Sequence, residues 1–356
     1  MSCSFVGYVK LLKTERDSWP EEIELAERSR IMQTVLIAIM RRMRRNRQGI
    51  WERRVMQSDD ALEALHTVDS HKASAVYPVA VLFNHSCEPN ICWIFLANGV
   101  AEARATRRIR VGESVDHCYG PKVGFQRRGE RQTALKRDYF FDCDCSACGS
   151  PERCRIEAEM SAYRCEKCSK LVVSLAELDR EFAAAHGYCA CAAQPEHNDK
   201  AEQVVAEWCE QLTKSILNEK SRDSTAETKQ LKELIHGYAR LEQMLHENNE
   251  RLNDARLLLA HWLVQKKLYA EAEPIIRRYV RTVKRNFGSA SLSTALALSK
   301  QCTVTWHTRR ELYWLSVATM MHIYTVHYGR DRVAQMFQQC NIDPRFIRAL
   351  REMSIE

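Results

Sequence analysis

The chain has 356 residues, of which 45% are hydrophobic and 28% charged, and its formal net charge is +7. This is the composition of a globular protein with room for two or three structural units. No apolar run approaches the ~20 residues that a membrane helix needs, and Lys10, Lys13 and Arg16 interrupt any signal-peptide core. The fifteen cysteines include C-x-C and C-x2-C clusters, which in a long chain without a leader indicate metal sites in a reducing compartment. We therefore expect a cytoplasmic and nuclear protein without a membrane partner.

Residues 1–74 are predicted to be mainly helical. Pro20 occupies a first-turn position, and apolar residues that include Ile31 and Val35 recur at helical spacing as far as Gly49. This pattern predicts one amphipathic helix over 20–48, with one stripe packed inward, and a second short helix is expected over 59–66.

Five of the seven residues from Arg41 to Arg47 are arginines. Such a run suits the solvated C-terminal end of a helix, where the macrodipole favours positive charge. It also suits a nuclear localisation signal or a contact to an acidic partner. Because no aromatic residues are interleaved with the arginines, we do not expect nucleic-acid binding.

The pattern changes to strands at Ala75. An apolar run over 77–83 stops at the sequence Asn-His-Ser-Cys-Glu-Pro-Asn, residues 84–90, which is called the knot below. Polar groups pressed against an apolar floor need specific partners. Strands are expected over 91–96, 100–106 and 114–119, with Asn98-Gly99 as a hairpin turn and a helix following over 125–137.

The cysteine of the knot, Cys87, lies about 55 residues before a C-x-C-x2-C cluster formed by Cys143, Cys145 and Cys148. Together they supply the four thiolates of a closed, structural zinc site, with no open position for a reactive water. The alternative is four unrelated reduced cysteines in a core.

Residues 151–198 carry a second group of cysteines, at spacings close to those of a zinc ribbon. Cys154, His186 and His197 are further candidate ligands, and the alternative is a loop with free thiols. The expected ligands are Cys165, Cys168, Cys189 and Cys191.

Residues 199–356 are predicted to be helical, with long helices expected over 251–267, 270–285, 291–301 and 309–326. Phe287-Gly288-Ser289 and Tyr328-Gly329-Arg330 recur 41 residues apart, which favours a tetratricopeptide-type stack of helix pairs. A groove lined by basic residues could take an acidic C-terminal peptide or a chaperone, the alternative being a solvated surface. The basic residues are Lys266, Lys267, Arg277 and Arg278.

The knot, the Gly112-Glu113 pair leading to Tyr119, and the segment from Tyr139 to Cys148 resemble the SET-and-MYND (SMYD) protein lysine methyltransferases. The resemblance is closest to the branch with tetratricopeptide-like helices. It implies an α+β fold: a partial SET β-fold with a helical insert, a zinc-bound post-SET segment, and an all-α C-terminal domain. The implied divisions are an insert over 1–74, a SET core over 75–120, a post-SET segment over 121–150, a possible second zinc module over 151–198 and a tetratricopeptide-like domain over 199–356.

The resemblance also implies roles for single residues. Asn84 and His85 would contact S-adenosylmethionine, and Phe141 would lie against its adenine. Tyr139 would also belong to the cofactor site and would form part of the wall of the lysine channel. Tyr119 would be the catalytic residue, orienting the lysine amine for in-line methyl transfer. Without that resemblance, Asn84 and His85 read as residues that satisfy backbone groups in a turn, and Tyr119 as a core aromatic residue.

The sequence departs from the family at its start, where neither the glycine-rich donor-binding segment nor the MYND zinc finger is found. We expect a protein-lysine N-methyltransferase that uses S-adenosylmethionine on histone or non-histone lysines, or a shortened form of one. The alternative is a catalytically inactive SET-derived scaffold that binds protein partners through its helical repeats.

Overall fold

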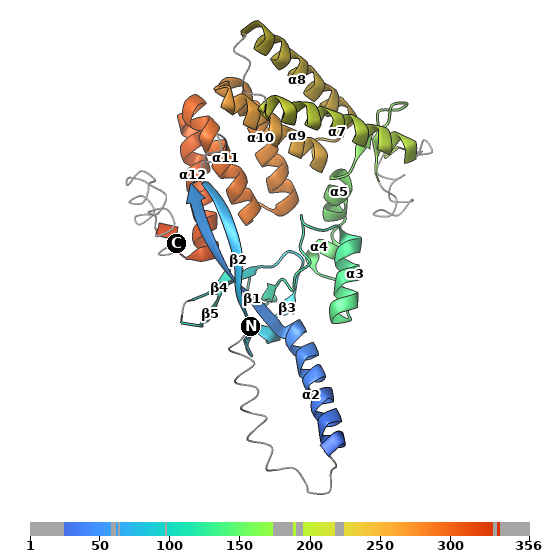
Figure 1. Ribbon diagram of the computed structural model, residues 1–356, viewed down its shortest axis with the longest axis vertical. Coiled ribbons are helices and arrows are strands. Elements are labelled where there is room, and N and C mark those ends of the chain that lie inside the picture. Colours follow the sequence, from blue (N-terminus) through green and yellow to red (C-terminus); the bar gives the residue numbers. More distant parts are fainter. Residues whose placement is uncertain are drawn as a thin grey trace. The chain divides into compact units, whose positions relative to one another are not determined.

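The computed structural model describes residues 25–57, 62, 65–96, 98–173, 188–189, 195–217, 224–329 and 333–334. Over these residues the fold is a mixture of α-helices and short strands, and the predicted helical C-terminal region is confirmed (Figure 1). None of the described helices is long and apolar enough to cross a membrane. The chain divides into two compact units: Met1–Gly49 with Ser74–Val81, and Ile50–Ala73 with Leu82–Glu356.

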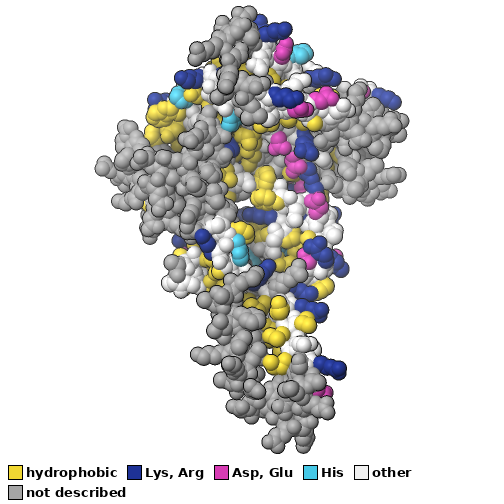
Figure 2. All heavy atoms as spheres, in the orientation of Figure 1, with side chains coloured by type: hydrophobic (Ala, Val, Ile, Leu, Met, Phe, Trp, Pro, Cys, Tyr) yellow, Lys and Arg dark blue, Asp and Glu magenta, His cyan; other side chains and the backbone are white. Residues whose placement is uncertain are grey.

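The first unit contains helix α2, Leu25–Asn46, within the predicted span 20–48. Its stripe is not packed inward as expected, since Ile31 and Val35 are 39% and 50% exposed. Figure 2 shows hydrophobic and basic side chains on the visible face of this helix.

A two-stranded sheet of β1, Arg47–Gln57, and β2, Leu65–Val76, stands where helices were predicted up to residue 74. Gly49 disfavours a longer helix, and the residues after it are rich in aromatic and β-branched types that suit a strand. The rings of Trp51 and His71 meet edge-on at a centroid distance of 5.0 Å. The short helix predicted over 59–66 falls mostly outside the described residues, and its last two positions belong to β2.

Two small strand pairs follow a 3-10 turn, η2, at Ala80–Leu82. In the parallel pair, β3 places Asn84 opposite Asp116 and His85 opposite His117 on β6. The antiparallel pair turns at Gly99, whose φ of 81° is a conformation that favours glycine. These strands are β3 Asn84–His85, β4 Ile91–Phe95, β5 Ala101–Ala105 and β6 Asp116–His117.

Within the described residues, three helices and a small hairpin connect these strands to the C-terminal region. The hairpin ends close to a long helix, because Tyr163 bridges to Leu245. The connecting elements are α3 Arg128–Tyr139, α4 Ser146–Gly149, α5 Pro151–Glu159, β7 Tyr163–Arg164 and β8 Leu171–Val172.

The C-terminal helices pack mainly on their neighbours in sequence, with α10 against α9 and α11, and α11 against α12 (Figure 1). Large apolar side chains such as Trp262 and Ile276 are fully buried between them, and this burial drives the packing. The bounds of the last four helices follow the predicted ones to within a few residues, except at the end of α11. The helices are α7 Pro195–Leu217, α8 Ser224–Met244, α9 Glu250–Gln265, α10 Tyr269–Phe287, α11 Leu292–Thr308 and α12 Arg310–Tyr328.

Two helical glycines offer a matched test of this packing. A Cβ on Gly237 of α8 would lie 2.4 Å from Cδ1 of the buried Trp208, whereas a Cβ on Gly129 of α3 would meet no atom within 4 Å. We expect overpacking in Gly237→Ala to lower the free energy of unfolding by about 1–3 kcal/mol. The better helix propensity of alanine should offset at most ~1 kcal/mol of this loss. Gly129→Ala should raise the free energy of unfolding by about 0.5 kcal/mol. Urea unfolding measures both, and an equal gain in stability from the two substitutions would show that α8 does not pack against Trp208 in this way.

Candidate functional site

The four cysteines predicted to form the first metal site come together in the structure. The Sγ atoms of Cys87, Cys143, Cys145 and Cys148 all lie within 4.8 Å of one another, and this group is called the sulfur cluster below. The Cys87 Sγ lies 3.9 Å from that of Cys143 and 3.6 Å from that of Cys148. A tetrahedral zinc ion with Zn–S bonds of ~2.3 Å requires sulfurs about 3.8 Å apart. The donor set therefore fits zinc in both chemistry and spacing.

Local backbone structure delivers each sulfur. The carbonyl of Cys87 accepts a hydrogen bond from the Val123 N–H at 3.0 Å, which ties the knot to the segment before α3. The Gln132 side chain clamps Cys143 at both backbone groups, at 2.6 and 3.0 Å. The N–H of Cys148 donates to the Cys145 carbonyl at 2.9 Å in the turn that starts α4. The C-x-C-x2-C spacing thus becomes a tight turn with its thiols on one side.

Arg131 supplies a buried positive charge beside the sulfur cluster. Its guanidinium donates to the Glu157 carboxylate at 2.7 Å and approaches the Cys148 Sγ at 3.8 Å. Hydrogen bonds from Cys148 and Cys87 lower the pKa of the Cys145 thiol, whereas the hydrogen bond to Cys145 raises the pKa of Cys87. Because four thiolates around one zinc ion carry a net charge of −2, a neighbouring guanidinium stabilises them.

His85 connects the sulfur cluster to Tyr119. Its Nδ1 accepts a hydrogen bond from the Tyr119 N–H at 3.0 Å, and its Nε2 lies 3.3 Å from the Cys87 Sγ. Burial lowers the pKa of His85 to about 4, so the ring is neutral near pH 7. Since Nδ1 is the acceptor, the single ring proton is on Nε2 and points at the sulfur.

The predicted residues Tyr139 and Phe141 form an aromatic slot around Tyr119 together with His85. The Tyr119 hydroxyl donates to the Phe83 carbonyl at 2.7 Å, and the Tyr139 hydroxyl donates to the Tyr119 carbonyl at 3.0 Å. The ring centroid of Tyr119 lies 4.9 Å from that of Tyr139 and 6.5 Å from that of Phe141. Burial raises the pKa of Tyr119, which keeps the phenol protonated. Asn84 adjoins this slot on β3 and is exposed.

Two contributors to the slot were missed in the sequence. The Phe83 carbonyl fixes the Tyr119 hydroxyl, and a backbone acceptor leaves no mark in a sequence. The second is His117, a buried residue whose ring lies 4.9 Å from that of Tyr119. Strand alternation over 114–119 could have indicated it, because residues 117 and 119 share one face of a strand.

The sequence of the chain is similar to those of known proteins over part of its length. No protein-family model matches the chain. The chain is 41% identical over 97 residues to the protein-lysine N-methyltransferase SMYD4 of Homo sapiens, a match that covers 27% of this chain and 12% of that protein. It is 30% identical over 162 residues to SMYD4 of Danio rerio, covering 37% and 21%, and 33% identical over 91 residues to the N-lysine methyltransferase SMYD2 of Homo sapiens, covering 26% and 20%. This chain is a relative of the SMYD protein-lysine methyltransferases.

The matches to these SMYD proteins span between 12% and 21% of the relatives' own lengths. They show similarity to the SMYD proteins over part of this chain, which spans well under a quarter of those relatives' lengths.

The second cysteine group is partly assembled in this SMYD relative. The Sγ atoms of Cys165, Cys168 and Cys189 lie within 4.8 Å of one another, and this hairpin cluster sits at the end of the β7–β8 hairpin. Hydrogen bonds from the backbone N–H groups of Cys168 and Lys167 lower the pKa of Cys165 to about 7, which favours the thiolate that zinc requires. Among the other candidate ligands, Cys191 and His186 lie outside the described residues, as does the His197 side chain, while Cys154 belongs to neither cluster.

The basic groove predicted on the C-terminal helices is partly neutralised by the chain itself. Arg278 lies 2.8 Å from the Glu242 carboxylate, and Arg277 lies 3.6 Å from that of Glu273 on its own helix. Both arginines already have carboxylate partners on the chain, which favours a solvated surface over a prepared peptide site.

Proposed function

We propose that this chain carries the lysine-binding and part of the donor-binding surface of a SET-type protein-lysine N-methyltransferase of the cytoplasm and nucleus. The observation that supports this best is the position of the Tyr119 hydroxyl. It lies in the aromatic slot beside Tyr139. The Tyr119 backbone N–H is hydrogen-bonded to His85, and the other nitrogen of that ring lies next to Cys87 of the sulfur cluster.

In this proposal zinc has a structural role. Cys87, Cys143, Cys145 and Cys148 would hold one ion, and the hairpin cluster would hold a second with a fourth ligand. Neither site has a place for a reactive water once four protein ligands are bound. The sulfur cluster would anchor the knot, and the knot would orient the Tyr119 backbone through His85.

Tyr119 is proposed to orient the substrate amine. Its hydroxyl proton is engaged by the Phe83 carbonyl at 2.7 Å, so the oxygen lone pairs are available to accept a hydrogen bond from an incoming lysine amine. S-adenosylmethionine, when bound, supplies an electrophilic methyl group. Tyr139 and Phe141 would exclude water and present their ring faces to positive charge. Alignment and desolvation by these residues are what an in-line displacement requires.

The divisions implied by the family are proposed to apply here: an insert over 1–74, a SET core over 75–120, a post-SET segment over 121–150, a second zinc module over 151–198 and a tetratricopeptide-like domain over 199–356. The packing of α9 to α12 on successive neighbours supports the last of these. Protein lysines would be the substrates.

Removal of the Tyr119 hydroxyl tests this function. We expect Tyr119→Phe to lower the rate of methyl transfer to protein substrates on the order of 100-fold, because the amine loses its alignment. Donor affinity measured by calorimetry should be nearly unchanged. Tyr269→Phe in α10 serves as the control and should leave both quantities unchanged.

Two outcomes would count against the function. One is Tyr119→Phe protein that transfers methyl groups at the wild-type rate. The other is zinc-loaded, folded wild-type protein that neither binds the donor nor methylates any protein in histone or cytosolic extracts, which would favour a catalytically inactive scaffold.

A further inference from the structure

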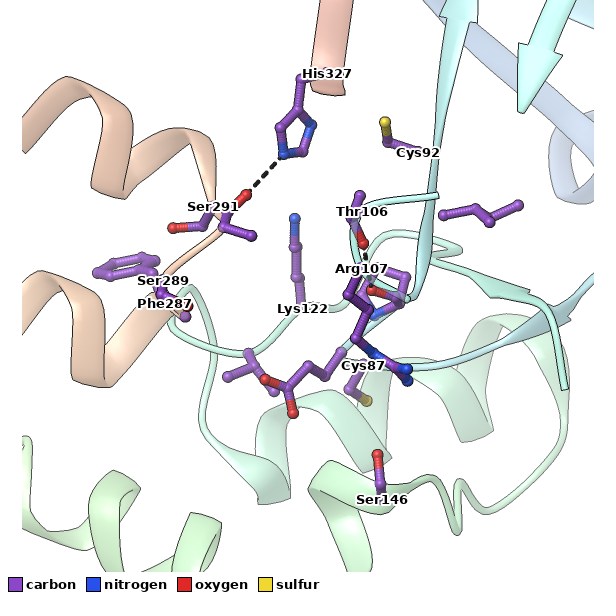
Figure 3. A pocket seen from close by; sticks show the side chains of 16 residues that line it. Cys87, Cys92, Thr106, Arg107, Lys122, Ser146, Phe287, Ser289, Ser291 and His327 are labelled. Carbon is purple, nitrogen blue, oxygen red and sulfur yellow. Dashed lines mark hydrogen bonds between the residues drawn. The ribbon is translucent and has the colours of Figure 1, made fainter. Parts of the chain in front are cut away.

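A cavity of about 230 Å³ lies beside the sulfur cluster, away from the contacts that build the aromatic slot. One wall is the end of the knot with Cys87 to Pro89, and the opposite wall is the loop 287–291 that joins α10 to α11 (Figure 3). His327 of α12 closes it from above in this view. All of these residues belong to the second unit.

Lys122 gives the cavity its charge. Its side chain extends into the space between the loop 287–291 and Thr106 (Figure 3), and it is half-buried. The other charged residues of the lining are already paired: Arg107 with Glu113 at 2.5 Å, and Glu88 with Arg153 at 3.6 Å. The Lys122 amine has no ion pair or hydrogen bond within the part of the chain that the structure describes. The cavity therefore holds one positive charge without a counter-charge.

The rest of the lining defines the ligand further. Ile91, Val123 and Phe287 form apolar walls, and Thr106 and Ser289 contribute hydroxyl groups. A phosphate group carries up to two negative charges and is usually held by several arginine or backbone donors. One unpaired amine between apolar walls instead matches a single carboxylate on an aliphatic body.

We propose that this cavity binds an aliphatic carboxylate, with its carboxylate group on Lys122. The carboxylate is either a glutamate side chain of a bound polypeptide or a small free carboxylic acid. A ligand here would touch both the knot and the loop 287–291, so it would bridge the strand region and the C-terminal helices. The assignment of this cavity does not rest on the proposed methyl transfer.

The test is protection of Lys122 from an amine-acylating reagent, followed in the full chain by mass spectrometry. The probes are N-acetyl-glutamic acid α-amide, its neutral counterpart N-acetyl-glutamine amide, butyrate and inorganic phosphate. We expect at least one of the two aliphatic carboxylates to slow acylation of Lys122 at least threefold without changing the rate at Lys136, an exposed lysine paired with Asp142. The glutamine compound should have no effect. Protection by the glutamate compound alone supports a polypeptide side chain, and protection by butyrate supports a free acid.

A pair of variants completes the experiment. Lys122→Met should abolish calorimetric binding of the protecting carboxylate, and Lys136→Met should retain it. Zinc content checks that both variants are folded. The assignment would be overturned if the glutamine compound protected equally well, or if neither carboxylate protected. It would also be overturned if phosphate protected better than either carboxylate, or if binding to Lys122→Met were unchanged.

Discussion

Replacing Cys87 with alanine is expected to remove one zinc ion from the protein and to unfold the region around the knot. The Cys87 Sγ lies 3.9 and 3.6 Å from two of its three partners, so three sulfurs from one short turn would remain without the ligand that joins them to the knot. Structural zinc sites bind with apparent free energies on the order of 10 kcal/mol, much of which is folding free energy. We expect this loss to exceed that of any other single substitution considered for this chain.

Zinc content per chain measures this effect. The wild-type protein should hold two zinc ions. Cys87→Ala should keep only the ion of the hairpin cluster, and Cys168→Ala should keep only the ion of the sulfur cluster. Cys302→Ala is the control, because Cys302 lies on α11 and belongs to neither cluster, and it should keep both ions. Two ions retained by Cys87→Ala would mean that Cys87 is not a ligand.

Arg131→Met is expected to lower the free energy of unfolding by about 3–5 kcal/mol, because it leaves a buried carboxylate without its partner. The side chains of Arg131 and Glu157 are 0% and 4% exposed, and their nearest atoms are 2.7 Å apart. Arg131 also approaches the Cys148 Sγ at 3.8 Å, so the variant should bind zinc more weakly as well. Denaturant unfolding of zinc-loaded protein gives the first quantity, and competition with a chelator gives the second.

A second substitution separates charge from packing at this position. In the double variant Arg131→Met/Glu157→Leu the buried carboxylate is gone as well, so the part of the lost stability that comes from its missing partner should return. Zinc binding should stay weaker, because the guanidinium beside Cys148 is still absent. Lys136→Met removes a comparable ion pair at the surface, with side chains 60% and 74% exposed, and should cost less than ~1 kcal/mol. A single Arg131→Met variant as stable as Lys136→Met would show that the buried pair contributes little.

The approach of the cysteines to one another was the most predictable part of this protein. C-x-C and C-x2-C spacings are short-range patterns, and a turn that places such thiols together needs little information from the rest of the chain. Cys87 was predictable for a different reason, because it interrupts an apolar run with a polar sequence. Cys191, the expected fourth ligand of the hairpin cluster, lies outside the described residues.

Helix periodicity predicted the C-terminal region well, because long amphipathic or buried helices carry their own signal. It failed at the N-terminal region, where residues 47–57 and 65–76 form strands. The sequences of these two strands lack the apolar alternation that marks a half-buried strand. Partners such as the Phe83 carbonyl, His117 and Arg131 depend on contacts between segments far apart in sequence, which local patterns do not encode.

Zinc-edge X-ray absorption on Cys168→Ala protein, in which only the sulfur cluster should be loaded, shows whether the four cysteines bind one ion. We predict a single shell of four sulfur atoms at about 2.3 Å from the metal. A shell with three sulfurs and one nitrogen or oxygen, or protein that folds without zinc, would contradict the convergence of Cys87, Cys143, Cys145 and Cys148 on one ion, and with it the basis for the slot around Tyr119.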